Sequence, residues 1–419
     1  MRSTSRPAVR RGLAVLLATS VAGLAGLAGP LTSAQADTAP PAGVPATVSA
    51  DALPTVQIDG VAWSQAVRGN VVYVGGAFGT ARPAGAAAGT STTVRNNLLA
   101  YDITTGALIT SFAPSLNAQV RQVSVSPDGT RVYVAGDFTQ ANGVSRNRVA
   151  AFNATTGALI TSFAPVLNSK ASSILATDTA IYVGGVFTSA NGNARSKVAA
   201  FAPSNGGLLP WNPNADSTVF AMVKTPGGKV VLGGNFQNVG GSAAYGLAGV
   251  DAVTGAQVPW NGNQKVRNAG ADSSINSLSI KGDKIYGSGY TYGAGGNLEG
   301  AFQADAESGD VTWVEDCHGD TYGVYPAAGA VYTVSHSHYC GNVDGFPQTE
   351  PWSLPAGDGV DHGRARHHHE RPDGLLQLGR HAAPRHAALV AAGRRRHLHR
   401  PEPGRLGGLR QRRLRRARR

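Results

Sequence analysis

The sequence repeats itself with a period of about fifty residues, and this feature limits the possible folds most strongly. The eleven residues Thr104–Pro114 recur without change as Thr155–Pro165, 51 positions later. A repeat of this length is one supersecondary unit that buries its apolar faces against neighbouring copies. The chain is therefore predicted to be a tandem array of one motif.

A second part of the repeat is a run of β-branched and aromatic residues that leads into glycine and then phenylalanine. Its four clear copies carry the phenylalanine at spacings of 60, 49 and 49 residues. Glycine inside a strand marks the close approach of another backbone, so these glycines are expected near a crowded axis, in a structural role. The residues concerned are Gly75, Gly76, Phe78, Gly136, Phe138, Gly184, Gly185, Phe187, Gly233, Gly234 and Phe236.

Each unit contains four predicted strands that are separated by turn signals. In one unit these strands cover residues 120–125, 132–138, 148–152 and 158–163. Asn153 can close the turn before the last strand by accepting hydrogen bonds from the backbone. Four short strands in each tandem unit predict an all-β fold, a β-propeller with six or seven four-stranded blades in the intact family member.

An aromatic residue ends each unit and should fill the space between neighbouring blades. The blades are predicted to begin near residues 57, 119, 170, 217, 273 and 319, within a propeller that spans residues 57–355. The sixth blade is cut short, so the ring is expected to be incomplete, with exposed strand edges. The aromatic residues are Phe112, Phe163, Trp211, Trp260 and Trp313.

These motifs carry a resemblance to known repeats. The units resemble the delta-60-type repeat of bacterial propellers, through Gly-Gly-x-Phe, an Asn-Gly loop, and Thr-Gly before a terminal Phe-x-Pro. They are also similar to the quinoprotein (PQQ-like) repeat, through Asp251–Gly255 with Trp260 and Ala306–Gly309 with Trp313. The resemblance covers about residues 57–352 and implies a secreted actinobacterial propeller. No adjacent cysteine pair accompanies it, so no cofactor is predicted.

Residues 1–36 are predicted to be a secretory signal peptide. Four arginines precede an apolar stretch at 12–29, and Ala34–Ala36 is a small-x-small cleavage site. A membrane anchor is the alternative, but glycine interrupts the stretch and a cleavage site follows it. Residues 37–56 form an Ala/Pro-rich linker. No later stretch is long and apolar enough to span a bilayer, so the mature protein is expected to be an extracellular monomer.

The formal net charge of +12 suggests a nucleic-acid partner, but the distribution of charge argues against one. Residues 361–419 hold 17 arginines and 4 acidic residues, whereas residues 37–360 carry 16 basic and 21 acidic residues. The body of the protein is therefore mildly acidic. We expect no nucleic-acid partner, because no basic face is implied for phosphates.

Residues 356–419 are predicted to be an Arg/His-rich tail without a packed core. From Asp361 onward the chain lacks Ser, Thr, Asn, Phe, Tyr and Trp, which the preceding body uses freely. Out-of-frame reading of a GC-rich gene gives such a composition, so we hypothesise a frameshift between about Trp352 and His362. The alternative is a genuine basic tail for anionic surfaces. Either tail should be disordered, since it carries strong like charge and no aromatic residue.

The two cysteines of the chain, Cys317 and Cys340, are predicted to form a disulfide, because paired cysteines in an exported protein usually do. In the chain-entropy model such a bridge contributes on the order of 3 kcal/mol. Polar residues around it could form a metal or acid–base site, but the simpler interpretation is a disulfide with polar neighbours, and no metal is predicted. The candidates are His318, Asp320, His336 and His338.

Arg95, Arg146 and Arg195 occupy equivalent positions in successive units. They could form a ring of cations on one face, or each could donate hydrogen bonds to a nearby loop. We favour the second interpretation, because the later units lack the arginine.

No sequence motif of a hydrolase elbow, a phosphate-binding loop or a zinc peptidase is visible. We therefore predict an extracellular, non-catalytic binding or adhesion scaffold, whose ligand is a glycan or another cell-surface molecule held by loops on one propeller face. The alternative is a secreted propeller enzyme, either a glycan hydrolase or lyase or a quinoprotein-like oxidoreductase. Paired carboxylates at the axial mouth would favour the enzyme, whereas a mouth of Gly, Ser and Asn would disfavour it.

Overall fold

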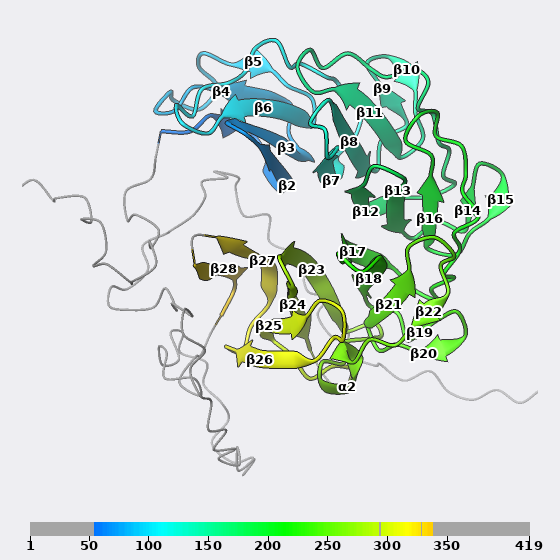
Figure 1. The fold of residues 1–419 in the computed structure, drawn as a ribbon. Helices are drawn as coiled ribbons and strands as arrows, with labels where there is room; N and C mark the ends of the chain where they lie inside the picture. The colour runs from blue at the N-terminus through cyan, green and yellow to red at the C-terminus, as the bar shows by residue number, and fades with distance from the viewer. Residues whose placement is uncertain (1–53, 293–294, 328, 338–419) are drawn as a thin grey trace, which may run out of the picture.

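The computed structural model describes residues 54–292, 295–327 and 329–337 (Figure 1). The predicted signal peptide, most of the predicted linker and the predicted tail lie outside these residues, as do His338 and Cys340. Within the described residues, no helix is long and apolar enough to cross a membrane.

The described chain forms six successive antiparallel sheets, blades 1 to 6, that follow one another around a common centre (Figure 1). The first strand of each blade lies innermost, and the first strands of neighbouring blades contact each other in order. The predicted all-β propeller fold is confirmed. The first strands are β2 (Val61–Arg68), β7 (Val120–Val125), β12 (Ala171–Ala176), β17 (Val219–Lys224), β23 (Ser273–Lys281) and β27 (Thr321–Ala327).

The outer strands of each blade pair in chain order, so every blade is a simple meander. The second strands are β3 (Val71–Ala77), β8 (Arg131–Gly136), β13 (Ile181–Gly185), β18 (Lys229–Gly234), β24 (Lys284–Thr291) and β28 (Ala330–Ser335). The third strands are β6 (Leu98–Asp102), β11 (Val149–Asn153), β16 (Val198–Phe201), β21 (Leu247–Asp251) and β25 (Gly300–Asp305). The fourth strands are β22 (Gln257–Val258) and β26 (Val311–Asp316).

In blades 1 to 4, the loops between the second and third strands contain short strands. In blade 1, one small sheet joins β1 (Gln57–Ile58), β4 (Thr80–Arg82) and β5 (Thr93–Val94). Blades 2 to 4 each carry a two-residue hairpin there. These hairpins are β9 (Gln140–Ala141) with β10 (Val144–Ser145), β14 (Ser189–Ala190) with β15 (Asn193–Ala194), and β19 (Asn238–Val239) with β20 (Ser242–Ala243). The four-residue helix α2 (Gly262–Lys265) follows blade 4.

Four strands per blade is correct for blades 4 and 5 but wrong in detail for blades 1 to 3. There the fourth segment makes one isolated bridge to the third strand, as between Phe152 and Leu159 in blade 2. The chain then turns, and the Phe163 N–H donates to the Ile160 carbonyl at 3.2 Å. The turn ends the pairing because it carries Phe163 inward to a fully buried position.

The aromatic residues that end the units lie in the apolar layers between blades, as the repeat predicts. Trp211 packs edge-on against Tyr182 at a centroid distance of 4.9 Å, in a cluster shared by blades 3 and 4. Its indole N–H donates to the Asp251 carbonyl of blade 4 at 3.0 Å. Apolar burial and a hydrogen bond thus link neighbouring blades at the same residue. The equivalent ring pairs are Tyr73 with Phe112, Tyr133 with Phe163, and Tyr286 with Trp313.

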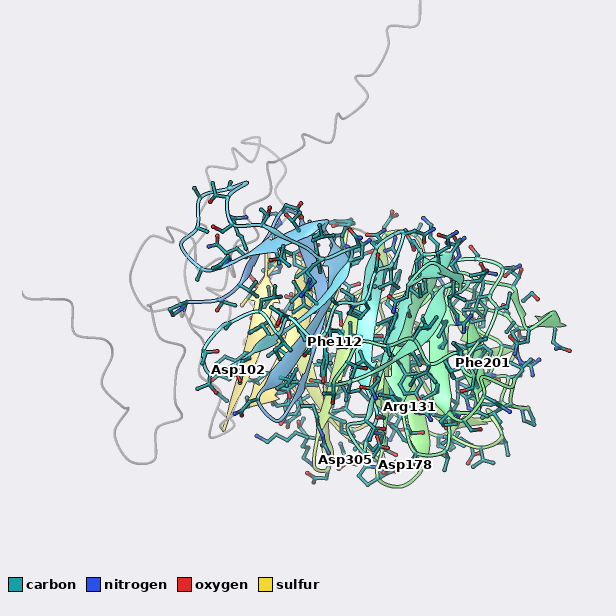
Figure 2. All side chains as sticks on the ribbon, turned by 90° about the horizontal axis from the view of Figure 1, so that it is seen from above. Asp102, Phe112, Arg131, Asp178, Phe201 and Asp305 are labelled. Carbon is teal, nitrogen blue, oxygen red and sulfur yellow. The ribbon has the colours of Figure 1, made fainter. Side chains whose placement is uncertain are left out.

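Two faces of the propeller differ in their loops. The turn face carries the hairpin turns between first and second strands and those between third and fourth strands; Figure 2 labels Asp178 and Asp305, one from each kind. Asp305 accepts backbone hydrogen bonds from Glu307 and Ser308, so it closes its turn as the motif predicts. The opposite face, where the chain enters each first strand, is called the entry face below.

Candidate functional site

The first strand of every blade is interrupted by a β-bulge near the entry face. The pairing register with the second strand shifts at the same place in all six blades. A bulge re-aims one side chain and is over-represented beside functional sites. The bulged residues form what we call the bulge ring: Trp63, Arg121, Ser172, Phe220, Asn276 and Tyr322.

The repeated glycines explain how the bulge is accommodated. A Cβ atom on Gly185 would lie 2.3 Å from the carbonyl oxygen of Lys170, two residues before the bulge. The second glycine of the motif therefore leaves room for the bulged strand. The same close approach to a carbonyl oxygen is found at Gly76, Gly136, Gly234 and Gly289.

The first glycine of the motif has a different role. A Cβ atom on Gly184 would lie 2.9 Å from the Val219 side chain of the next blade. Gly75 and Gly233 likewise face the first strand of the following blade. These residues allow the inner strands of adjacent blades to pack closely, and blade 2 tolerates alanine at this place, Ala135.

Bulge-ring side chains are exposed or half-buried, whereas the residues that precede them in blades 2 to 6 are buried. Trp63 is 55% exposed and Tyr322 is 54% exposed, although both lie on innermost strands. The ring therefore presents aromatic and polar side chains to solvent around the centre of the molecule. It is neither a pair of carboxylates nor a lining of Gly, Ser and Asn alone.

Blades 1 and 2 are joined at the ring by a continuous hydrogen-bond network. The Trp63 indole N–H donates to Gln119 Oε1 at 2.8 Å, and Gln119 Nε2 donates to Asp137 Oδ2 at 2.7 Å. Arg121 donates two hydrogen bonds to the same carboxylate, from Nε at 2.8 Å and from Nη2 at 3.0 Å. This two-point contact fixes the plane of the guanidinium group. The exposed indole is therefore held in one orientation.

Asp137 stays ionised in this network. Burial would raise its pKa, but hydrogen bonds from Arg121 and Gln119 and the charges of Arg121 and Lys170 lower the pKa overall. The Lys170 ammonium group lies 3.9 Å from Asp137 Oδ2, and the lysine side chain is 56% exposed. Two cations thus surround one carboxylate, which leaves an excess of positive charge beside Trp63.

The ring is acidic on the opposite side, at blades 5 and 6. Asp320 accepts hydrogen bonds from the hydroxyl of Tyr292 at 2.6 Å and from that of Tyr322 at 3.1 Å. The bond to Asp320, burial and the carboxylate charge raise the pKa of Tyr292. Tyr292 also packs against Tyr290 in a tilted arrangement, with ring centroids 5.0 Å apart. Asp320 occupies in blade 6 the position of Gln119 in blade 2.

The sequence-predicted polar constellation falls in this acidic part. The His336 N–H donates to the Asp320 carbonyl at 2.8 Å, and His318 has a positive φ of 44° in the connection into β27. His338 lies outside the described residues. Among the residues that the structure describes, no group of three or more His, Cys, Asp or Glu side chains could hold a metal ion.

The last two residues of β26 carry half-buried carboxyl groups beside Cys317. Cys317 is buried and its sulfur contacts Glu315 Oε1, whereas its predicted partner Cys340 lies outside the described residues. Burial, with the charge of Asp316, raises the pKa of Glu315 to about 7. Burial also raises the pKa of Asp316. The disulfide stays a prediction.

The three repeated arginines do not form a ring of cations. Arg146 is buried and donates to the carbonyl oxygens of Ser145 at 2.7 Å and Thr161 at 2.9 Å. Arg95 and Arg195 make the same pair of contacts in blades 1 and 3. They fasten the loop before the third strand to the fourth segment, which accounts for their recurrence.

Sequence reasoning did not find the bulge ring. Its residues share no chemistry from blade to blade, so no motif contains them. A usable signal exists: alignment of the six units places a changing residue directly after a position that stays small or β-branched, such as Ser172 after Ala171. Positions that vary within a regular repeat are free of packing constraints and available for binding.

Comparison with known proteins gives similarity to solved structures at low sequence identity. No protein-family model and no curated protein matches the chain. Among solved structures, it is similar to the WD40 beta propeller domain of Doa1, with 14% identity, a TM-score of 0.35, and coverage of 54% of this chain and 60% of that one. It is also similar to the computationally designed Ika4 protein, with 17% identity, a TM-score of 0.29, and coverage of 42% and 85%. The chain thus spans less than two thirds of the Doa1 domain.

Proposed function

We propose that this protein is an extracellular, non-catalytic binding scaffold that holds a glycan over the bulge ring. The observation that supports this most directly is the recurrence of one bulge in six blades, with an exposed aromatic side chain at Trp63 and another at Tyr322. Aromatic side chains beside fixed polar groups combine apolar contact with directional hydrogen bonds.

We also propose that the repeat is of the delta-60 type and that the protein is secreted. The Gly-Gly-x-Phe and Thr-Gly motifs support a delta-60-type propeller from an actinobacterium, and the arginine-led apolar leader supports secretion. A disulfide between Cys317 and Cys340 belongs to the same proposal, because an exported protein meets an oxidising environment.

The carboxylates beside the ring support binding over catalysis. Asp137 is paired with Arg121, and Asp320 accepts hydrogen bonds from two tyrosines. The two carboxylates belong to different blades, and each has partners of the kind that orient a binding surface.

The test is a glycan array probed with the full chain and with Trp63→Ala. We expect the chain to retain a small set of glycans, and Trp63→Ala to weaken their binding about tenfold, as for an exposed aromatic anchor. Val253→Ala is a matched control, because Val253 is 80% exposed on the turn face. Hydrolysis of a retained glycan, or equal binding by Trp63→Ala, would contradict the proposal.

A further inference from the structure

The entry face carries charges of opposite sign on the two sides of the bulge ring. On blades 2 and 3, Arg148 donates to the Asp137 carbonyl and Lys197 Nζ donates to the Val186 carbonyl at 3.2 Å. Arg121 and Lys170 lie beside the Asp137 carboxylate, so these two blades carry four cations in all. Arg121 lies in β7, whereas the other three residues lie directly before the first or third strand of their blade.

Carboxylates occupy the other half of the same face. Asp316 Oδ1 accepts the Glu299 N–H at 3.2 Å. Asp320 follows in the connection between β26 and β27. Burial and the charges of Asp316 and Asp320 raise the pKa of Glu299. An anion near the ring is therefore attracted toward blades 2 and 3 and repelled from blades 5 and 6.

Trp63 lies at the border of the basic half. Its indole N–H is committed to Gln119, so the ring is oriented by the same network that holds Arg121. Among the described residues, the remaining Arg121 nitrogen, Nη1, has no protein hydrogen-bond partner, and the Lys170 side chain is 56% exposed. A flat apolar surface, a planar donor and an exposed cation are thus linked through Gln119 and Asp137.

We infer that the site formed by Trp63, Arg121 and Lys170 binds an anionic saccharide. The sugar ring packs against the indole, and its acidic group binds the free edge of the guanidinium and the ammonium group. An ionised carboxylate and a sulfate ester both supply such an acidic group. The inference rests on the proposed function and adds the charge of the ligand to it.

The test is a titration followed by ¹⁹F NMR on the full chain labelled with 5-fluorotryptophan. The Trp63 signal is assigned with Trp63→Phe. Observing this one residue separates the site from any binding by the arginine-rich residues 361–419. The probes are trigalacturonate, a sulfated trisaccharide and neutral maltotriose. We expect saturable shifts with at least one anionic probe, at an affinity about tenfold above that for maltotriose; the tighter anionic probe identifies the acidic group.

Two lysine variants make the test specific. Lys170→Gln should weaken binding of the anionic probe about fivefold, as expected for loss of one exposed ion pair. Lys281→Gln removes the same charge at an exposed position of the turn face and should leave the affinity unchanged. Equal shifts with maltotriose, or an unchanged affinity in Lys170→Gln, would overturn the inference while leaving glycan binding intact. Absence of any Trp63 shift would also overturn it, and the glycan array then decides the proposed function separately.

Discussion

At the residue scale, the two glycines of the repeated motif perform different tasks. Gly184 faces the next blade, whereas Gly185 faces a carbonyl oxygen of its own blade at the bulge. The first can be replaced by a small residue, as Ala135 shows, because side chains of the neighbouring blade can adjust. The second faces backbone, which cannot move without breaking strand pairing.

Gly185→Ala is predicted to lower the free energy of unfolding by about 3 kcal/mol, because its Cβ would overlap the Lys170 carbonyl. Gly323→Ala in β27 is the matched control, since no atom lies within 4 Å of its Cβ position, and its effect should be below about 0.5 kcal/mol. Urea unfolding of both variants measures the difference. Equal stability of the two would show that the bulge does not depend on this glycine.

At the element scale, the hairpin of β27 and β28 is the part most sensitive to its surroundings. It is a two-stranded sheet, and its outward residues Tyr325 and Val334 are 64% and 67% exposed. The connection that leads into it begins at Cys317, whose sulfur contacts half-buried Glu315 at the end of β26. Both the charge of the carboxyl group and the state of the cysteine should therefore control the hairpin.

The hairpin is predicted to loosen as the pH rises from about 5 to 8. Burial raises the pKa of Glu315 from 4.5 to about 7, so the folded state prefers the protonated carboxyl group. The resulting stabilisation of the folded state is complete below the pKa of the unfolded state and is lost as the pH rises through the pKa of the folded state. The free energy lost over this range is about 3 kcal/mol. Amide hydrogen exchange in β27 and β28 measures the loosening. Glu315→Gln should remove most of the pH dependence, and an unchanged dependence would argue against this residue as its source.

The predicted disulfide gives a separate test on the same element. Reduction of the bridge, or Cys317→Ser, should lower the free energy of unfolding by about 3 kcal/mol in the chain-entropy model. Mass spectrometry of peptides with and without reductant shows whether Cys317 and Cys340 are joined. Recovery of both cysteines alkylated from the unreduced protein would refute the disulfide.

At the scale of the whole molecule, the inner strands are connected to their neighbours by side chains. Ser64 Oγ accepts the Val123 N–H at 3.1 Å, and Ser124 Oγ accepts the Ala176 N–H at 3.0 Å. Each blade is thus stabilised mainly by the blades on either side, as in other repeat proteins. The described residues run from blade 1 to the hairpin of blade 6, and no sheet among them joins these two ends.

The chain as printed is predicted to unfold over a broad temperature range. The outward side of β2 at blade 1 leaves Val67 54% exposed, and the described residues of blade 6 form only the hairpin of β27 and β28, so a sheet edge is open between them. A gene whose frame is restored after Trp352 should encode a chain that melts in one sharp transition at a higher temperature. Circular dichroism compares the two. A sharp melt of the printed chain, or failure of any single-base correction to extend the repeat, would contradict the frameshift hypothesis.

The sequence by itself determined the repeat unit, the strand order and the turns, because these depend on local preferences and on apolar periodicity. Asn153 and Gly157 form the predicted turn, and blades begin within a few residues of their predicted positions. The tertiary structure alone decided where the bulges lie and which side chains they bring together. Trp63 and Arg121 are 58 positions apart and belong to different blades, and only the packing of one inner strand beside another places them in one network.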